Sequence, residues 1–170
     1  MSGKDTTANY LAEKYSAAHF RFSHILDDIL RMLSLDVSRR NEIDLGLGLR
    51  KIFGEHVLVN ALQARAKSSQ NEIIVVNGIR MDEFEVVKGW DSAKIIYITA
   101  PIETRFERYK QRHEKADDAA TGIDAFAAQE KEPTEVGIPG LGAKADFRID
   151  NTGTLEDLYK KTDEIIKGLK

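Results

Sequence analysis

Two short apolar runs, each followed by a helical pattern, constrain most strongly what this chain can fold into. The runs at residues 72–76 and 94–99 are rich in Ile and Val, and such continuous apolar character is typical of a strand covered on both faces. Helical spacing follows each run, through Phe84 to Trp90 and from Ile102 to about His113. Because strands that alternate with helices favour right-handed crossovers, the sequence predicts an α/β fold with a three-layer, doubly wound parallel sheet.

The rest of the chain extends this alternation. Further elements are predicted at residues 19–22 (strand), 23–33 (helix with Ser23 as N-cap), 38–67 (two helices with a flexible joint), 145–150 (strand) and from Thr154 onward (helix with a capping-box-like start). Residues 114–144 are polar, Ala-rich and interrupted by Gly and Pro, which favours a lid with a short helix at about 123–131. The 170 residues suffice for one core, so we expect a single domain over 1–170.

Composition excludes several classes of function. The net charge of −3 does not favour a surface for nucleic acid, so a local basic cluster must hold any anionic ligand. The chain has no cysteine, which excludes disulfides and thiolate metal sites, and its four histidines show no metal-ligand spacing. No segment approaches the roughly 20 apolar residues that cross a bilayer. We therefore expect a cytoplasmic protein with neither a nucleic-acid nor a membrane partner.

Residues Ser2–Thr7 match the second half of the phosphate-binding pattern G-x-x-x-x-G-K-[ST], and a helical pattern begins at once behind them. Lys4 would neutralise charge on a transferred phosphoryl group, because a helix N-terminus already favours anions; the alternative is a solvated lysine. Thr6 is the first choice for a hydroxyl on Mg²⁺ or phosphate, with Asp5 reaching the ion through water, unless both are simply first-turn residues. The complete motif starts with a strand and a glycine, which we expect upstream of Met1.

A turn at Asn77, Gly78 and Arg80 follows the first apolar run. Ligands of open α/β sheets bind beyond the carboxyl ends of strands, and the planar fork of arginine suits an acceptor phosphate. Arg80 is therefore predicted to bind the acceptor. Asn77 either orients the acceptor or a metal-bound water, or only forms the turn.

Arginines gather in two further places. Arg105, Arg108 and Arg112 are spaced by three and four residues, so they crowd one helix face, where they either stabilise charge during phosphoryl transfer or are solvated beside neighbouring glutamates. Arginines of the earlier helical region are also candidates to line an acceptor pocket, together with the residue that ends the first short strand: Arg21, Arg39, Arg40 and Arg50. For the carboxylate pair Asp27–Asp28, a capping or solvated role is favoured over catalysis.

Taken together, these motifs resemble the P-loop nucleoside-monophosphate-kinase-like group, nearest to dephospho-CoA kinase and its archaeal nucleotide-kinase-like relatives. The resemblance covers nearly the whole chain and rests on residues 2–6, 76–80, 100–108 and 145–158. It implies a P-loop NTPase fold, ATP as donor, Mg²⁺ as cofactor and a phosphate-bearing small-molecule acceptor. It also implies site residues: Ser2, Gly3, Lys4, Asp5, Thr6 and Thr7 at the donor phosphates, Arg80 at the acceptor, Arg108 and Arg112 on the lid side, and Asn151 to Gly153 near the adenine.

Two departures from the family pattern leave two hypotheses open. Asp5 replaces the usual hydroxyl residue, and Asn77 stands where an acidic residue is frequent. The leading hypothesis is an ATP-dependent kinase that transfers the γ-phosphoryl group to a (deoxy)nucleoside monophosphate or to dephospho-CoA. The alternative is a kinase-derived module that has lost catalysis and senses a nucleotide.

Overall fold

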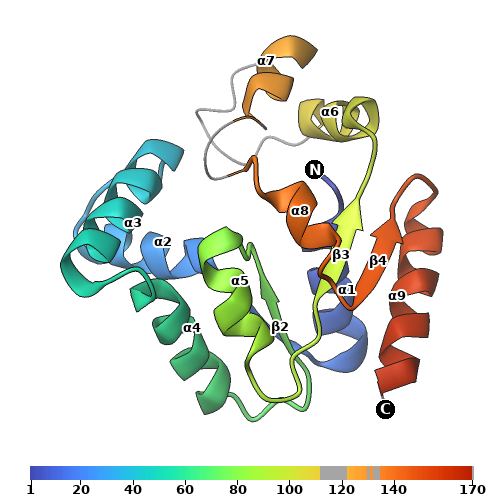
Figure 1. Cartoon of the computed structure of the whole chain (residues 1–170), viewed down its shortest axis with the longest axis horizontal. Helices are drawn as coiled ribbons and strands as arrows, with labels where there is room; N and C mark the ends of the chain where they lie inside the picture. Colours follow the sequence, from blue (N-terminus) through green and yellow to red (C-terminus); the bar gives the residue numbers. More distant parts are fainter. Residues whose placement is uncertain (112–121, 130, 132–134, 170) are drawn as a thin grey trace.

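The computed structural model describes residues 1–111, 122–129, 131 and 135–169, in which helices alternate with parallel strands (Figure 1). This confirms the α/β fold predicted from the sequence. In chain order the elements are α1 (Lys4–Tyr15), β1 (Ala18–Arg21), α2 (Phe22–Met32), α3 (Arg39–Phe53), α4 (Val57–Ser68), β2 (Ile74–Asn77), α5 (Met81–Lys88), β3 (Ile96–Thr99), α6 (Ile102–Lys110), α7 (Ile123–Gln129), α8 (Ile138–Gly142), β4 (Phe147–Asp150) and α9 (Leu155–Leu169).

The four described strands form two parallel pairs. β1 pairs with β2 from Ala18 opposite Ile74 to Arg21 opposite Asn77, and β3 pairs with β4 along their whole length. Within the described chain no ladder joins β2 to β3. The apolar runs predict strands covered on both faces, but every residue of β3 is only half-buried, because β3 is paired along one edge alone.

Helix α1 is the element that connects the two strand pairs. It packs against β1 and β2 on one side and against α9, which flanks β4, on the other. Leu11 of α1 and Ile166 of α9 share one buried cluster, with Val75 of β2 packed against it. A second cluster, built on Ile25, Leu26, Leu58 and Leu62, holds α2 to α4 beside β1 and β2. The phosphate-loop residues at the start of α1 are thus carried by a helix anchored to both pairs.

The helices differ from the sequence expectation at two points. Helix α2 begins at Phe22, directly after the extended residue Arg21, so Ser23 is not its N-cap. Helix α8 was not predicted, because the sequence Ile-Pro-Gly-Leu-Gly has the composition of a loop. Its Leu141 is nevertheless buried, and the helix contacts α5. The described parts of the segment 114–144 therefore include packed structure, while the closing of a lid over the site stays a prediction.

No helix in the described ranges is both long and apolar enough to cross a membrane.

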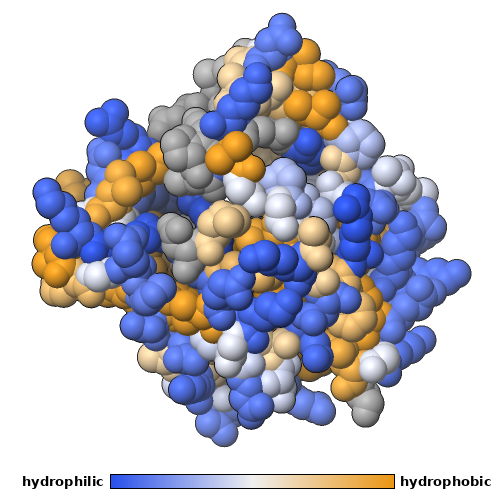
Figure 2. All heavy atoms as spheres, in the orientation of Figure 1, coloured by the Kyte–Doolittle hydropathy of each residue, from blue (hydrophilic) through white to orange (hydrophobic). Residues whose placement is uncertain are grey.

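Helix α3 exposes apolar as well as charged side chains. Figure 2 shows apolar atoms gathered over the side of the molecule that carries α3, where the exposed apolar residues of this helix are Ile43, Leu47, Ile52 and Phe53.

Candidate nucleotide and acceptor site

The loop before α1 has the geometry of an anion-binding helix start. Gly3 is the N-cap of α1, makes no side-chain cap, and has a φ of +111°, a conformation that glycine adopts without strain. A Cβ atom at Gly3 would lie 2.4 Å from Nδ2 of Asn151. The first amide groups of a helix lack intrahelical partners, and the helix dipole favours negative charge there. Glycine at this position therefore keeps the loop compact and the amides of the first turn available to an anion.

Asp5 gathers charged and polar groups at the carboxyl ends of β1 and β2. Nζ of Lys4 donates a 2.7 Å hydrogen bond to Oδ2 of Asp5, and Nδ2 of Asn77 donates to Oδ1 of Asp5 at 2.8 Å. Nε of Arg21 lies 3.8 Å from the same Oδ1. Arg21 and Asn77 end two adjacent strands and are register partners. The loop lysine thus lies beside a carboxylate that a second cation and an amide hold in place.

Asn151, directly after β4, links the loop to the other strand pair. Its buried side chain donates from Nδ2 to the carbonyl oxygen of Ser2 at 2.8 Å. Its own carbonyl oxygen accepts from Nη2 of Arg108 at 3.2 Å, while Nη1 of Arg108 is buried without a hydrogen-bond partner among the described residues. Ser2, Asn151 and Arg108, predicted separately, are therefore brought together.

Gly153 lies in the turn between β4 and α9. A Cβ atom there would be 2.5 Å from Oδ2 of Asp157. The same carboxylate accepts from the backbone N–H of Thr154 at 2.8 Å, and this hydrogen bond lowers the pKa of Asp157. The turn that carries Asn151 is thus fixed by a capped helix start.

On the acceptor side, two predicted arginines share a buried partner. Nη2 of Arg50, on α3, donates to Oε1 of Glu83, on α5, at 2.6 Å. Oε2 of Glu83 accepts from the backbone N–H of Arg80 at 3.2 Å. The guanidinium of Arg80 in turn donates to Oε1 of Glu135 at 2.8 Å. Gly78, before Arg80, has a φ of +87°, so it supplies the turn after β2.

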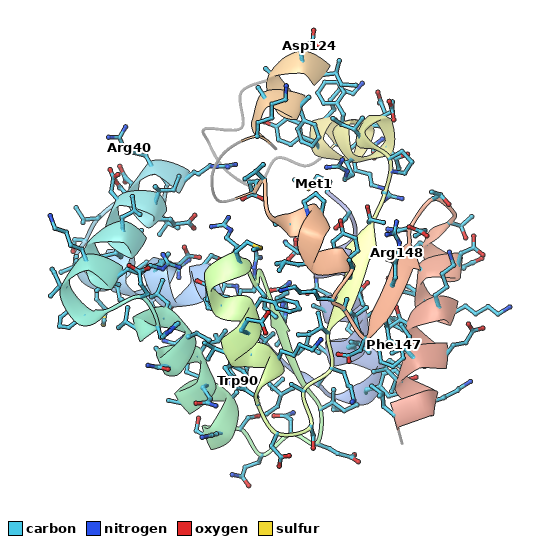
Figure 3. The ribbon with its side chains drawn as sticks, viewed as in Figure 1. Met1, Arg40, Trp90, Asp124, Phe147 and Arg148 are labelled. Atoms are coloured by element: carbon cyan, nitrogen blue, oxygen red, sulfur yellow. The ribbon has the colours of Figure 1, made fainter. Side chains whose placement is uncertain are left out.

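Other predicted residues lie apart from these groups or outside the described chain. Arg40 is ion-paired with Asp44 on its own helix at 2.7 Å, and Figure 3 shows it at the outer tip of α3, far from Met1. Arg39 is exposed at the start of the same helix. Arg112 lies outside the described residues. The roles of these three arginines stay predictions.

Sequence reasoning missed Glu83 and gave little weight to Arg21. Glu83 stands among charged residues of α5, and nothing in this composition marks it as the buried one; the available signal was its place three residues after Arg80, where a helix-start glutamate reaches back to the backbone. The sequence presents Arg21 only as one of several arginines that could line an acceptor pocket. Its position at the end of a strand beside β2 was the signal that could have singled it out.

The donor atoms near the loop fit a magnesium ion bound with a nucleotide. Within the described ranges, no three His, Cys, Asp or Glu side chains group into a metal site. Mg²⁺, however, usually takes one or two carboxylates together with waters and substrate phosphates. Asp5 supplies the carboxylate. Two other side-chain oxygens are buried without a hydrogen-bond partner among the described residues: Oγ1 of Thr7, two residues after Asp5, and Oδ1 of Asn77, whose amide nitrogen contacts Asp5. Thr6 and Asp5 remain the predicted metal residues.

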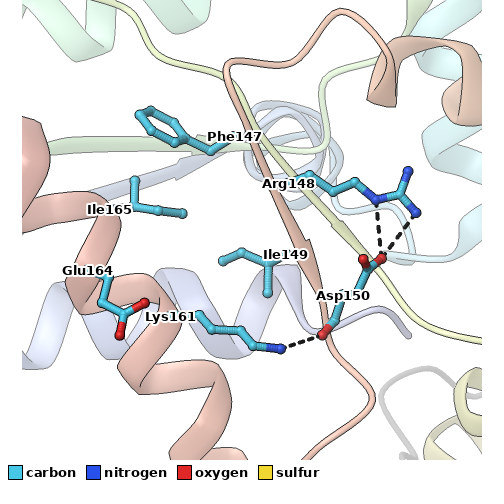
Figure 4. Close-up of a pocket in the computed structure, with 7 residues that line it drawn as sticks. All are labelled: Phe147, Arg148, Ile149, Asp150, Lys161, Glu164 and Ile165. Carbon is cyan, nitrogen blue, oxygen red and sulfur yellow. Dashed lines mark hydrogen bonds and ion pairs between the residues drawn. The ribbon is translucent and has the colours of Figure 1, made fainter.

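A cavity of about 500 Å³ lies elsewhere, between β4 and α9 (Figure 4). Its lining includes Phe147, Ile149 and Ile165, together with Lys161, whose Nζ donates to the carbonyl oxygen of Asp150 at 2.8 Å. None of the predicted site residues lines it. The candidate site therefore rests on the contacts around the loop and the strand ends, not on this cavity.

Residues 1–132 match the family model described as AAA domain. The chain belongs to the AAA-domain family. It is 28% identical over 169 residues to a UPF0200 protein of Sulfurisphaera tokodaii, an alignment that covers 98% of this chain and 90% of the relative. The relative's name states no activity.

Solved structures give the same fold. A shikimate kinase from Acinetobacter baumannii in complex with shikimate matches with a TM-score of 0.60 at 18% identity, over 99% of this chain and 89% of that chain. The protein TT1252 from Thermus thermophilus matches with a TM-score of 0.55 at 18% identity, over 99% and 93%. At this identity the likeness shows the fold alone. It confirms a P-loop kinase-like fold and does not single out dephospho-CoA kinase.

Proposed function

We propose that this protein is an ATP-dependent, cytoplasmic phosphotransferase that acts on a phosphorylated, nucleotide-like small molecule, a (deoxy)nucleoside monophosphate or dephospho-CoA. The observation that carries the proposal is the meeting of three groups at the start of α1. These are the glycine–lysine loop, the Asp5 cluster at the ends of β1 and β2, and the Asn151–Arg108 pair after β4. Phosphoryl transfer needs mostly positioning and positive charge, and these are what the arrangement offers.

The donor side consists of the loop, Lys4, Asn151 and Arg108. The first-turn amides of α1 and the ammonium of Lys4 would bind the terminal phosphates of ATP. Asn151 fixes the carbonyl of Ser2 and thereby the loop. Mg²⁺, held by Asp5 and a threonine hydroxyl, would neutralise charge on the phosphates. The buried Nη1 of Arg108, which has no partner in the described chain, is suited to a developing negative charge.

The acceptor side consists of Asn77, Arg80 and Arg50. Asn77 ends β2 and Arg80 lies in the turn behind it. Arg50, on α3, is joined to that turn through Glu83. Two guanidinium groups suit a phosphate-bearing acceptor, because each offers planar, paired donors. Their carboxylate partners, Glu83 and Glu135, balance that charge in the structure described here.

In the proposed step, an oxygen atom of the acceptor forms a bond to the γ-phosphorus of ATP. The bond from that phosphorus to the β,γ-bridging oxygen breaks, and its electron pair leaves with ADP. A hydroxyl acceptor releases its proton to water, whereas a phosphate oxygen has none to release. Lys4 and Arg108 would stabilise the charge that develops on the transferred group and on the bridging oxygen.

A second candidate function is nucleotide sensing without catalysis. It is favoured by one observation: the ammonium of Lys4 is bonded to Asp5, which stands where the family carries a hydroxyl residue. A carboxylate that retained this lysine after nucleotide binding would leave the transferred phosphoryl group without its cation. The two candidates differ in turnover and not in nucleotide binding.

The test is a coupled assay of ADP release with ATP and Mg²⁺ over a panel of nucleoside monophosphates and dephospho-CoA, with shikimate as a comparison acceptor. We expect acceptor-dependent turnover that Lys4→Ala lowers by at least about 100-fold, the effect of removing one group that stabilises transition-state charge. Lys51→Ala, which removes an exposed lysine of α3, is the charge-matched control. Nucleotide binding without turnover on any acceptor would reject the kinase and favour the sensor.

A further inference from the structure

Glu83 is the one carboxylate that is buried among the side chains described, with 2% of its surface exposed. Burying a carboxylate is costly unless it is paired and hydrogen-bonded. Its neighbour on the same helix, Glu85, is instead largely exposed and pairs with Lys144 at the surface. A glutamate that only caps the N-terminus of a helix does not need to be buried, because a capping hydrogen bond also forms at the surface. The position of Glu83 therefore needs a reason beyond starting α5.

The contacts of Glu83 supply that reason. One carboxylate oxygen accepts from the guanidinium of Arg50 at 2.6 Å, and the other from the backbone N–H of Arg80 at 3.2 Å. Arg50 belongs to the last turn of α3 and Arg80 to the turn after β2. The first N–H groups of α5 add favourable potential at the same carboxylate. One buried group thus sets the distance between two arginines from separate elements.

Arg50 is held firmly and still has hydrogen-bonding capacity. Its side chain is 20% exposed, and its Nε is buried without a partner among the described residues. A Cβ atom at Gly46, one turn earlier on α3, would lie 3.3 Å from Nη1 of Arg50. The guanidinium therefore packs closely over a glycine and meets Glu83 through a single nitrogen. A planar fork fixed in this way retains donors for a second anionic partner.

We propose that Glu83 is a positioning residue for the acceptor: it fixes Arg50 and the Arg80 turn so that both present donors to one phosphate group of the acceptor. This rests on the proposed function. An arginine held beforehand loses less side-chain entropy on binding, so Glu83 lowers the KM for the acceptor. It touches neither ATP nor the reacting atoms, and the KM for ATP does not depend on it.

The first test is steady-state kinetics with the acceptor that the panel identifies. In Glu83→Gln we expect the KM for the acceptor to rise about tenfold, the effect of losing one charge-assisted hydrogen bond, with the KM for ATP within twofold. Glu85→Gln makes the same change two residues away and leaves both values unchanged. Equal changes in both KM values would overturn the positioning role. If Glu83→Gln fails to fold, Arg50→Lys, which keeps the charge and loses the fork, must give the same split.

The second test does not need turnover. The Nε–Hε NMR signal of Arg50 is followed while AMP, dephospho-CoA or inorganic phosphate is added. We expect a shift with at least one of the three, and about tenfold weaker binding in Glu83→Gln but not in Glu85→Gln. No shift with any probe overturns the positioning role. A shift that depends on Glu83, with no turnover on any acceptor, overturns the proposed function and supports the positioning role.

Discussion

The two strand pairs of this protein are held by different kinds of contact. At the ends of β1 and β2 the partners are charged side chains: Asp5 with Lys4 and Arg21, and Arg50 with Glu83. Around β3 and β4 three cationic side chains donate to backbone carbonyls, beside an ion pair of Arg148 with Asp150 on β4. Nε of Arg105 donates to Ala100, Nη2 of Arg108 to Asn151, and Nζ of Lys161 to Asp150. Near the loop, ion pairs therefore hold the β1–β2 pair, and hydrogen bonds to the main chain hold the β3–β4 pair.

This difference suggests different roles for the two halves. A carboxylate partner such as Asp5 can be exchanged for a phosphate of similar charge and geometry, so the contacts of Asp5 can rearrange around a substrate, whereas the buried Glu83 keeps Arg50 in place. A backbone carbonyl remains in place, so the β3–β4 half gives the loop a fixed support. Helix α1 joins them, because Gly3 packs on Asn151 while Asp5 contacts Arg21 and Asn77. The predictions that follow test this division.

The largest effect is expected at Gly3, where the two halves meet. In Gly3→Ala the new Cβ lies 2.4 Å from Nδ2 of Asn151 in a backbone conformation that favours glycine. We expect a cost of about 1–3 kcal/mol in the free energy of unfolding, and loss of measurable ATP binding. Thermal unfolding and ATP titration measure the two effects. Gly168→Ala is the control, because nothing lies near its Cβ position. Tight ATP binding by Gly3→Ala would show that the loop does not need this geometry.

In the β1–β2 half, the next largest effect is expected on the magnesium requirement when Asp5 is changed. Asp5→Asn keeps the size of the side chain and removes the carboxylate that would approach the ion. The Mg²⁺ concentration for half-maximal turnover should rise about tenfold, because a divalent cation loses its charged oxygen partner. Asp44→Asn removes an exposed carboxylate that is paired with Arg40 and should change nothing. An unaltered magnesium requirement in Asp5→Asn would exclude Asp5 as a metal residue.

In the β3–β4 half, a smaller effect is expected, and only on the KM for ATP. Asn151→Ala removes the hydrogen bond to the carbonyl of Ser2. We expect the KM for ATP to rise about fivefold, as for the loss of a neutral hydrogen bond, while the KM for the acceptor stays constant. Asn71→Ala is the matched control, because this asparagine also donates to a backbone carbonyl, that of Ser16, away from the site. If the KM for the acceptor changed more than the KM for ATP, Asn151 would belong to the acceptor side and not to the donor side.

The smallest effect concerns the anchor between α1 and α9. Asp163 accepts hydrogen bonds from Lys14, Tyr15 and Tyr10 at 2.6, 2.8 and 2.9 Å, and these lower its pKa to about 2, with Lys14 as the largest cause. A lowered pKa in the folded state stabilises the fold above the unfolded value, near 3.9. That stability is lost as the pH falls from about 4 to 2.

Asp163→Asn should therefore melt a few degrees lower at pH 6 and show a flatter decline of melting temperature between pH 4 and pH 2. Glu164→Gln changes the exposed neighbour and should keep the decline of the unaltered chain. Circular dichroism melts at several pH values measure both. The same acid dependence with and without Asp163 would show that other carboxylates control it.

Much of the fold could be predicted from the sequence, because apolar runs and helix signals are local. The runs around Ile74 and Ile96 predict strands, and Ser38 caps α3 through a hydrogen bond from the N–H of Asn41. Helix α8 could not be predicted, because its formation depends on packing against α5.

The site was predictable only where a motif marks it. Gly3, Lys4 and Arg80 stand in patterns that carry a physical role, and the resemblance predicts Asn151 near the adenine. Glu83 could not be found in this way, because burial of one glutamate among several on α5 is decided by tertiary contact with Arg50. Residue type and spacing thus indicate which side chains bind or stabilise the phosphates. Which other side chains position them depends on tertiary contacts that the sequence does not mark.

Transfer of labelled phosphate tests the central claim most directly. The protein is incubated with γ-labelled ATP, Mg²⁺ and each acceptor, and the label is followed into product. The account predicts label in a phosphorylated acceptor, reduced at least about 100-fold in Lys4→Ala and unchanged in Lys51→Ala. Label found only in inorganic phosphate, or equal transfer by Lys4→Ala and the unaltered protein, would contradict a phosphotransferase centred on the loop before α1.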